Sequence, residues 1–141
     1  VGSGNPKGVR SASDLAQTGL CFINRNPGSG TRLWLDAELE RLDIPTEKID
    51  GYETTVNTHT ECAQAVANGK ADAAIGLQAS ALQHNLDFIP LFEERYDLIL
   101  PREQEDTLAP LLDYIQTAEF RQTVSTLTGY TTTHSGEQIT L

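Results

Sequence analysis

Residues 20–35 of the chain have the sequence LCFINRNPGSGTRLWL. The apolar run Leu20–Ile23 predicts a short buried strand. A turn rich in asparagine, proline and glycine follows it, and behind the turn Leu35, Leu39 and Leu42 recur at helical spacing. The stretch therefore predicts a strand, a glycine-rich turn and the first turns of an amphipathic helix.

The turn carries the donors that a small anion needs. A Gly-Ser-Gly-Thr turn that enters a helix leaves the N–H groups of Gly30 and Thr31 unpaired, and the helix dipole adds partial positive charge there. Ser29 and Thr31 add hydroxyl groups. Arg25 and Arg32 bracket the turn, where they either balance a ligand's charge or pair with nearby carboxylates. The structural alternative is that Ser29 or Thr31 merely caps the helix.

This turn differs from the common nucleotide-binding loops. No Gly-Lys-Ser/Thr sequence follows it, and Leu33 stands where the dinucleotide pattern requires a third glycine. The anion expected here is therefore small and free.

A second helix start has a similar placement. The string 52–56 predicts a strand, and Thr58 followed by Glu61 makes a capping-box pattern with His59 in the first helical turn. In open α/β sheets, ligands gather at the carboxyl ends of strands, where such helices begin. Two helix N-termini that face one cleft would together bind one tetrahedral anion.

The remaining pattern alternates short extended and helical segments. Thr46 is placed to cap a helical turn, and a strand ending at Gly76 is expected within 70–76. Further segments are expected as follows: extended at 87–92 and 95–100, and helical at 14–16, 78–85, from 103 onward and at 118–127.

Composition excludes several functions. The 141 residues carry 20 acidic and 10 basic side chains, a net charge of −10, which argues against direct nucleic-acid binding. The overall field does not attract an anion either, so capture would depend on local donors. No apolar run approaches the roughly 20 residues that span a membrane.

Metal binding and catalysis are not expected. The three histidines lack metal-ligand spacing. Ser29, His59 and an aspartate could be arranged as a hydrolytic triad, but the Gly-x-Ser-x-Gly elbow is absent. Cys21 and Cys62 occupy positions typical of buried free thiols, which fits a reducing compartment, and a disulfide between them stays open.

Several segments together resemble the periplasmic-binding-protein-like domain related to molybdate-binding proteins. They are 4–8, 13–16, 22–32, 65–76 and 88–100. The motif Asn-Arg-x-Pro-Gly-Ser-Gly-Thr-Arg is fairly specific to this group, whereas Gly-Ser-Gly-Thr alone also resembles the phosphate-binding relatives. The resemblance implies a type II fold, with two α/β lobes, a hinge and a ligand in the cleft. By position it implies the anion loop at Ser29, Gly30 and Thr31, the second helix start at Thr58 and His59, and a hinge-side tyrosine at Tyr96.

The resemblance also implies a division into lobes. Residues 14–95 would form the α/β lobe with the anion-binding loop, and 1–13 with 96–141 the hinge and return segments of the other lobe. The family's first lobe normally begins before residue 4, so the chain is expected to be truncated at its N-terminus, a second lobe plus part of the first. Exposed inter-lobe surface would then favour a homodimer.

The function expected is non-enzymatic binding or sensing of a small oxyanion, molybdate or tungstate, without cofactor or metal. Family members of this kind are ligand domains of transcriptional regulators or transport systems, often fused to a helix-turn-helix domain or to a molybdopterin-biosynthesis protein. The expected location is cytoplasmic, with periplasmic as the alternative. Binding of phosphate, sulfate or a small organic anion, a ligand-free oligomerisation module and an esterase-like enzyme stay open as alternatives.

Overall fold

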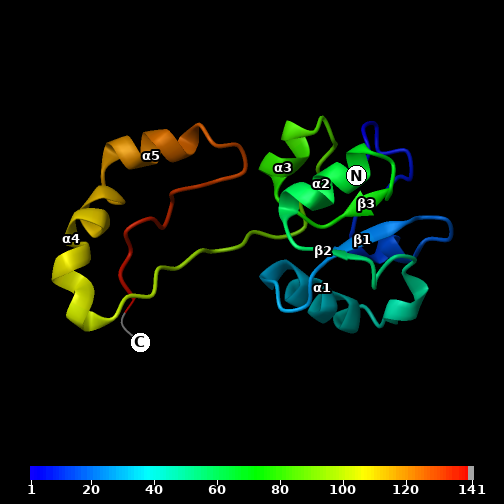
Figure 1. Ribbon diagram of the computed structural model, residues 1–141, viewed down its shortest axis with the longest axis horizontal. Helices are drawn as coiled ribbons and strands as arrows, with labels where there is room; N and C mark the ends of the chain where they lie inside the picture. The colour runs from blue at the N-terminus through cyan, green and yellow to red at the C-terminus, as the bar shows by residue number, and fades with distance from the viewer. Residues whose placement is uncertain (140–141) are drawn as a thin grey trace. The chain divides into compact units, whose positions relative to one another are not determined.

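The computed structural model describes residues 1–139, and the chain divides into two compact units, Val1–Phe92 and Glu93–Leu141 (Figure 1). Residues 1–13 belong to the first unit here. The assignment of 14–95 to one lobe, and of 1–13 with 96–141 to another, stays a prediction.

The first unit is built on a small parallel sheet, which confirms the α/β class. Its strand order is β2-β1-β3, and the strands are β1 (Phe22–Arg25), β2 (Thr55–Val56) and β3 (Ala73–Ala74). Asn24 pairs with Thr55 on one side, and Phe22 pairs with Ala73 on the other. The central strand lies two residues further along than the apolar run predicted, because backbone pairing with both neighbours sets its bounds.

Helices cover both faces of this sheet. They are α1 (Gly30–Arg41), α2 (His59–Ala67) and α3 (Gln78–Gln83), with single 3₁₀ turns at Ala12–Ala16 and Thr46–Lys48. Side chains alternate along β1, so Phe22 joins a core with Leu35 and Leu39 of α1, whereas Ile23 joins one with Val66 of α2. All four residues of β1 are buried, as expected of a strand covered on both faces.

Two details of the first unit differ from the sequence-based expectations. Pro45, not Thr46, is the N-cap of the Thr46–Lys48 turn, because the proline itself adopts the extended conformation that precedes a helical turn. Cys21 is only half-buried, since it precedes β1 and does not lie within it, whereas Cys62 is buried as expected.

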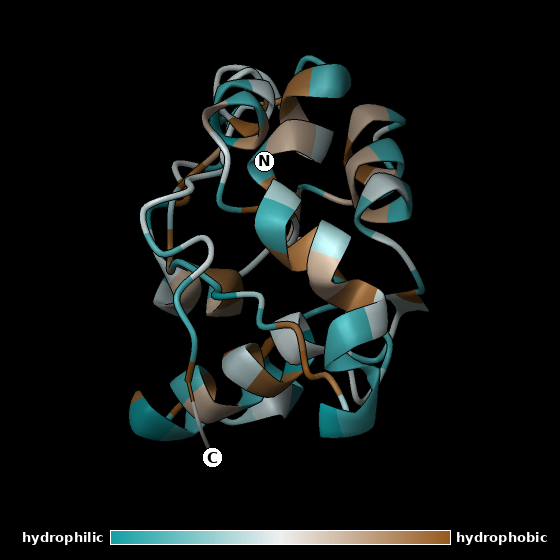
Figure 2. Cartoon of the chain, turned by 90° about the vertical axis from the view of Figure 1, so that its left-hand side faces the viewer, coloured by the Kyte–Doolittle hydropathy of each residue, from teal (hydrophilic) through white to brown (hydrophobic). Residues whose placement is uncertain are grey.

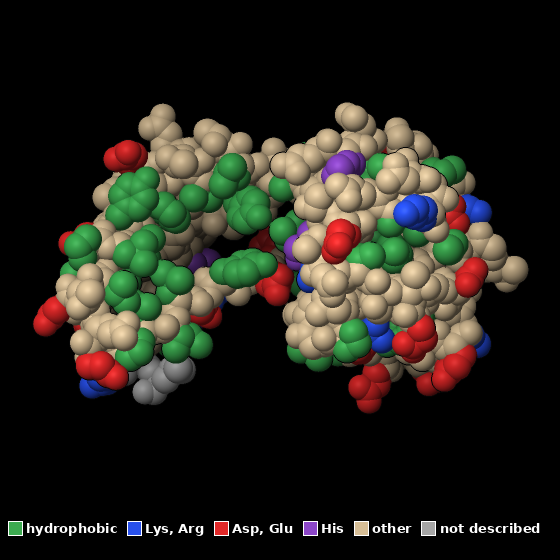
Figure 3. All heavy atoms as spheres, viewed as in Figure 1, with side chains coloured by type: hydrophobic (Ala, Val, Ile, Leu, Met, Phe, Trp, Pro, Cys, Tyr) green, Lys and Arg blue, Asp and Glu red, His purple; other side chains and the backbone are tan. Residues whose placement is uncertain are grey.

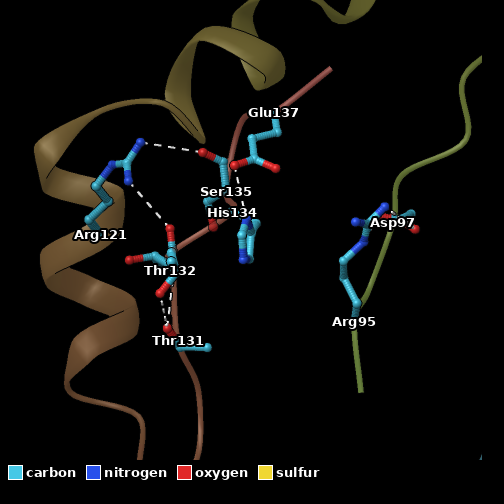
Figure 4. Close-up of polar contacts among 9 residues, drawn as sticks. Arg95, Asp97, Arg121, Thr131, Thr132, His134, Ser135 and Glu137 are labelled. Atoms are coloured by element: carbon cyan, nitrogen blue, oxygen red, sulfur yellow. Dashed lines mark hydrogen bonds and ion pairs between the residues drawn. The ribbon is translucent and has the colours of Figure 1, made fainter. Parts of the chain in front are cut away.

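The second unit contains two helices, α4 (Glu105–Tyr114) and α5 (Ala118–Ser125), and a 3₁₀ turn at Arg102–Gln104. The Tyr114 and Phe120 rings meet edge to face with centroids 5.8 Å apart. Figure 4 shows Arg121 of α5 donating to the carbonyl oxygens of Thr132 and Ser135, at 3.3 Å each. These contacts hold the polar segment after α5 against that helix.

The expected extended segments 87–92 and 95–100 form no strand. Within the described residues of the second unit, no side chain is buried, although apolar and polar residues alternate along its helices (Figure 2). Leu111 and Leu127 lie within the two segments expected to be helical, and they are 43% and 50% exposed. The spacing makes these helices amphipathic, but this unit offers their apolar faces no core, and apolar side chains show on its surface (Figure 3).

Candidate functional site

The carboxyl ends of all three strands lie at the same edge of the sheet, because the strands are parallel. β1 ends at Arg25, β2 at Val56 and β3 at Ala74, and α1, α2 and α3 begin within five residues of these ends. This edge is where parallel α/β sheets place ligands. The residues predicted for the anion site around positions 25–31 and 58–59 belong to it.

Arg25, the last residue of β1, connects the carboxyl ends of β1 and β2. It is 8% exposed, and its Nη2 donates to the carbonyl oxygen of Asn57 at 2.9 Å. Its Nη1 lies 3.0 Å from Nδ1 and 2.9 Å from Nε2 of His59. Its Nε is buried and has no hydrogen-bond partner within residues 1–139. One donor of a fixed, buried cation is therefore left unpaired at this edge, a costly arrangement unless a partner arrives.

His59 lies next to the residue that follows the third strand, β3. A Cβ placed on Gly76, just after β3, would lie 3.7 Å from Nδ1 of His59 and 3.9 Å from Cβ of Cys62. A guanidinium has only donors, so a hydrogen bond from Arg25 requires an unprotonated nitrogen on the ring of His59. Arg25 and His59 therefore bring all three strand ends together.

The anion loop begins α1 in the way the sequence predicted. Ser29 is the N-cap, and its Oγ accepts the N–H of Arg32 at 3.3 Å, so the capping role is present. Accepting that bond leaves the hydroxyl proton free to donate. The N–H groups of Gly30 and Thr31 meet no acceptor in the described part of the chain, and Thr31 is 6% exposed with no side-chain hydrogen bond. This helix end is open to an anion.

The start of α2 differs in this respect. The capping box is confirmed: Oγ1 of Thr58 accepts the N–H of Glu61 at 3.1 Å. In return the Glu61 carboxylate accepts from the Thr58 hydroxyl and from the N–H groups of Asn57 and Thr58 at 2.8–3.0 Å. These bonds lower the pKa of Glu61. The N-terminus of α2 is therefore already bound by the Glu61 carboxylate, and the Thr58 hydroxyl already donates its hydrogen bond to that carboxylate.

The guanidinium of Arg32 contacts Asp36, Tyr52 and the backbone of Arg25. Its Nε donates to Oδ1 of Asp36 at 2.8 Å, its guanidinium carbon lies 4.0 Å from the centre of the Tyr52 ring, and its Nη1 donates to the Arg25 carbonyl oxygen at 3.4 Å. The side chain is thus engaged in the pairing with a carboxylate that the sequence left open. Its role toward a ligand stays a prediction.

Tyr96 belongs to the second unit, where its side chain is 72% exposed. Its assignment to the hinge side of the site stays a prediction.

Sequence reasoning missed three residues of the site. Asn57 and Gly76 follow the two outer strands, which the sequence predicted, but nothing in their local sequence marks these two residues as part of a site. Asn24 is 1% exposed in the central strand, donates from Nδ2 to the Tyr52 carbonyl oxygen at 3.1 Å and accepts the N–H of Arg25 at 2.9 Å. An asparagine next to a buried apolar run was its detectable signal, because a buried amide must be hydrogen-bonded.

A surface hollow lined by Thr46, Glu47 and residues 49–54 precedes β2 and lies away from these strand ends. Its lining includes Glu47, Asp50 and Glu53, which makes it unsuited to an anion. Among residues 1–139, no group of three or more His, Cys, Asp or Glu side chains could hold a metal ion. No helix of the described chain is long and apolar enough to cross a membrane.

The fold and this edge define a ligand-binding α/β domain, and the sequence comparisons identify its family. The chain belongs to the periplasmic-binding-protein (PBP) superfamily, whose domain profile matches residues 1–116. The chain is 35% identical over 139 residues to the uncharacterized protein YvgK of Bacillus subtilis, covering 99% of this chain and 45% of that protein. It thus spans less than half of that relative.

A second relative is an uncharacterized protein of Clostridium pasteurianum encoded in the 5′ region of a 2Fe-2S ferredoxin gene. It is 37% identical over 109 residues, which cover 75% of this chain and 96% of that protein. No solved structure matches the chain. Family membership implies ligand binding, and the ligand itself has to be argued from the site.

Proposed function

We propose that the first unit binds a small oxyanion, molybdate or tungstate, at the beginning of α1. The observation that carries the proposal is the set of unused donors there. The N–H groups of Gly30 and Thr31 and the hydroxyl of Ser29 lack acceptors, beside a buried Arg25 whose Nε is unpaired. A helix N-terminus with a neighbouring cation is a general anion site.

The geometry favours one compact anion. Glu61 already occupies the start of α2, so a second negative charge there would be repelled, and the ligand's charge must be met by α1 and Arg25. Because the chain carries a net charge of −10, binding rests on short-range hydrogen bonds and not on the overall field. A tetrahedral oxyanion offers four acceptors in a small volume. The resemblance noted in the sequence favours molybdate or tungstate over sulfate and phosphate.

In the larger setting, the domain would serve as the ligand-binding part of a cytoplasmic regulator or of a transport system. A DNA-binding domain, fused or separate, would then be its partner, and binding would be read out as a conformational change. The second unit, with exposed apolar side chains, would contribute to homodimerisation.

Thermal unfolding in the presence of anions tests the proposal. Molybdate, tungstate, sulfate and phosphate are titrated at matched ionic strength, followed by calorimetry with any anion that raises the melting temperature. A ligand at about 100 times its Kd adds roughly 2.7 kcal/mol of stability. A rise with molybdate or tungstate supports the proposal, a rise with sulfate or phosphate alone reassigns the ligand, and no rise with any of the four contradicts oxyanion binding.

A further inference from the structure

We infer that Arg32 is a positioning residue, which fixes the anion loop from behind together with Asp36 and Tyr52 and does not touch the anion. This inference rests on the proposed function, because it concerns the same loop. It assigns a role to two residues, Asp36 and Tyr52, that lie outside the set predicted from sequence.

The guanidinium of Arg32 contacts three residues of the first unit. The residue is 7% exposed, and the guanidinium contacts the Asp36 carboxylate through Nε, the Tyr52 ring through its face and the Arg25 carbonyl oxygen through Nη1. To reach a ligand, the buried Arg32 side chain would have to break a charge-assisted bond to Asp36 and its contact with the Tyr52 ring. The positive charge of Arg32 is therefore paired with Asp36 within the protein.

Arg32 contacts both sides of the turn that it follows. Its backbone N–H donates to Oγ of Ser29, and its side chain donates to the carbonyl oxygen of Arg25. Arg25 is the last residue of β1, and Ser29 is the N-cap of α1. One residue thus fixes the end of the strand against the start of the helix, and with them the direction of the open N–H groups.

Tyr52 links Asp36 to the central strand, through its hydroxyl and its backbone carbonyl group. Its hydroxyl donates to Oδ1 of Asp36 at 2.6 Å, the oxygen that also accepts from Arg32. Its carbonyl oxygen accepts from Asn24, which holds the N–H of Arg25. The contacts therefore run in a closed ring from Arg25 through Asn24, Tyr52 and Asp36 to Arg32 and back. Burial raises the pKa of Tyr52, so its phenol remains a donor at neutral pH.

The test uses Tyr52→Phe, which removes the bond to Asp36 but keeps the ring under Arg32. Tyr52→Phe, Arg32→Lys and the double variant are compared with the wild type by calorimetry, at a temperature where urea titration shows every variant to be folded. The anion is the one of molybdate, tungstate, sulfate and phosphate that binds the wild type most tightly. Arg41→Lys, at an exposed position on the same helix, is the matched control.

A positioning role predicts that Tyr52→Phe weakens binding by about 3- to 10-fold, the equivalent of one lost hydrogen bond. Arg32→Lys should weaken it too, because lysine lacks the planar fork, and the double variant should be no weaker than the Arg32→Lys single variant. A purely structural role would lower stability and leave the affinity of the folded protein unchanged.

Three outcomes overturn the inference. Wild-type affinity in Tyr52→Phe, with loss only in Arg32→Lys, would make Arg32 a ligand contact. Wild-type affinity in both would remove Arg32 and Tyr52 from the site while leaving the proposed function intact. If the wild type binds none of the four anions, the proposed function itself fails, and the positioning role fails with it.

Discussion

Arg25 and His59 hold the carboxyl ends of neighbouring strands together, with Nη1 of Arg25 within 3.0 Å of both imidazole nitrogens. Arg25 ends β1, and His59 begins the helix that follows β2. The buried cation is thus positioned before any ligand arrives, so binding need not order it, and preorganisation of this kind raises affinity.

Arg25→Lys is expected to weaken oxyanion binding by about tenfold or more. Lysine keeps the charge but lacks the planar fork whose separate nitrogens contact His59 and Asn57, and it has no counterpart of the unpaired Nε. Calorimetry measures the affinity, and urea unfolding measures the accompanying loss of stability. Arg41→Lys should behave like the wild type in both, and equal affinity in Arg25→Lys would exclude Arg25 from the site.

Ser29 has two roles that two substitutions separate. Ser29→Ala removes both the cap and the hydroxyl donor, and it should lower stability by about 1 kcal/mol. Ser29→Gly also removes the hydroxyl, but a glycine N-cap costs only a few tenths of a kcal/mol. Both variants should lose about 1–3 kcal/mol of binding free energy, measured by calorimetry, if the hydroxyl is a buried donor. Normal affinity in Ser29→Gly would leave Ser29 as a cap alone.

Glu61 predicts a pH dependence of stability. Its pKa is lowered in the folded chain by the Thr58 hydroxyl and the N–H groups of Asn57 and Thr58. The ionised carboxylate therefore stabilises the fold above its unfolded pKa of about 4.3, and this stabilisation is lost as the pH falls through the folded-state pKa. As the pH is lowered from about 6 to about 3, the free energy of unfolding should therefore fall less in Glu61→Gln than in the wild type.

Urea titrations across this pH range measure the difference. Glu40→Gln, a change at an exposed position of α1, is the matched control and should follow the wild type. Identical acid sensitivity in Glu61→Gln and the wild type would show that the capping box makes no contribution to acid unfolding.

Gly51 is expected to tolerate no side chain. Its φ is +87°, and a Cβ there would fall well inside contact distance of the Phe22 carbonyl oxygen, with the Phe22 carbonyl carbon at 3.0 Å. Gly51→Ala should therefore cost at least about 2 kcal/mol of unfolding free energy, because it strains the backbone and pushes on the central strand. Gly69→Ala, at a similar φ of +68° with open space around it, is the control for backbone strain alone. Equal losses in the two variants would remove the steric argument.

The two thiols should differ in reactivity. Cys62 is 1% exposed, and burial raises the pKa of its thiol to about 11, whereas Cys21 is half-buried. In Cys21→Ser, the remaining Cys62 should react with a chromogenic disulfide reagent about 100-fold more slowly than Cys21 does in Cys62→Ser. Unfolding in urea should abolish the difference. Fast labelling of native Cys62 would show that α2 opens readily from the sheet.

Much of the local structure follows from short-range sequence signals. The Asn-Pro-Gly-Ser-Gly turn and the leucines behind it predicted the strand, the turn and α1, and the Thr58–Glu61 pattern predicted the start of α2. These predictions succeeded because capping and helical periodicity involve residues within one or two turns of each other. Capping and periodicity could not predict how the two-residue strands β2 and β3 pair with β1, because two residues show no periodicity.

The sequence alone determined that this chain forms an α/β domain with open donors at the beginning of α1, because backbone geometry and capping are local. Tertiary structure decided how those donors are used. It brought Arg25 against Asn57 and His59, turned Arg32 toward Asp36 and Tyr52, and buried Arg25 with one donor unpaired. Such choices depend on which side chains meet across a sheet, and burial makes each unpaired charge or donor costly enough to select one arrangement.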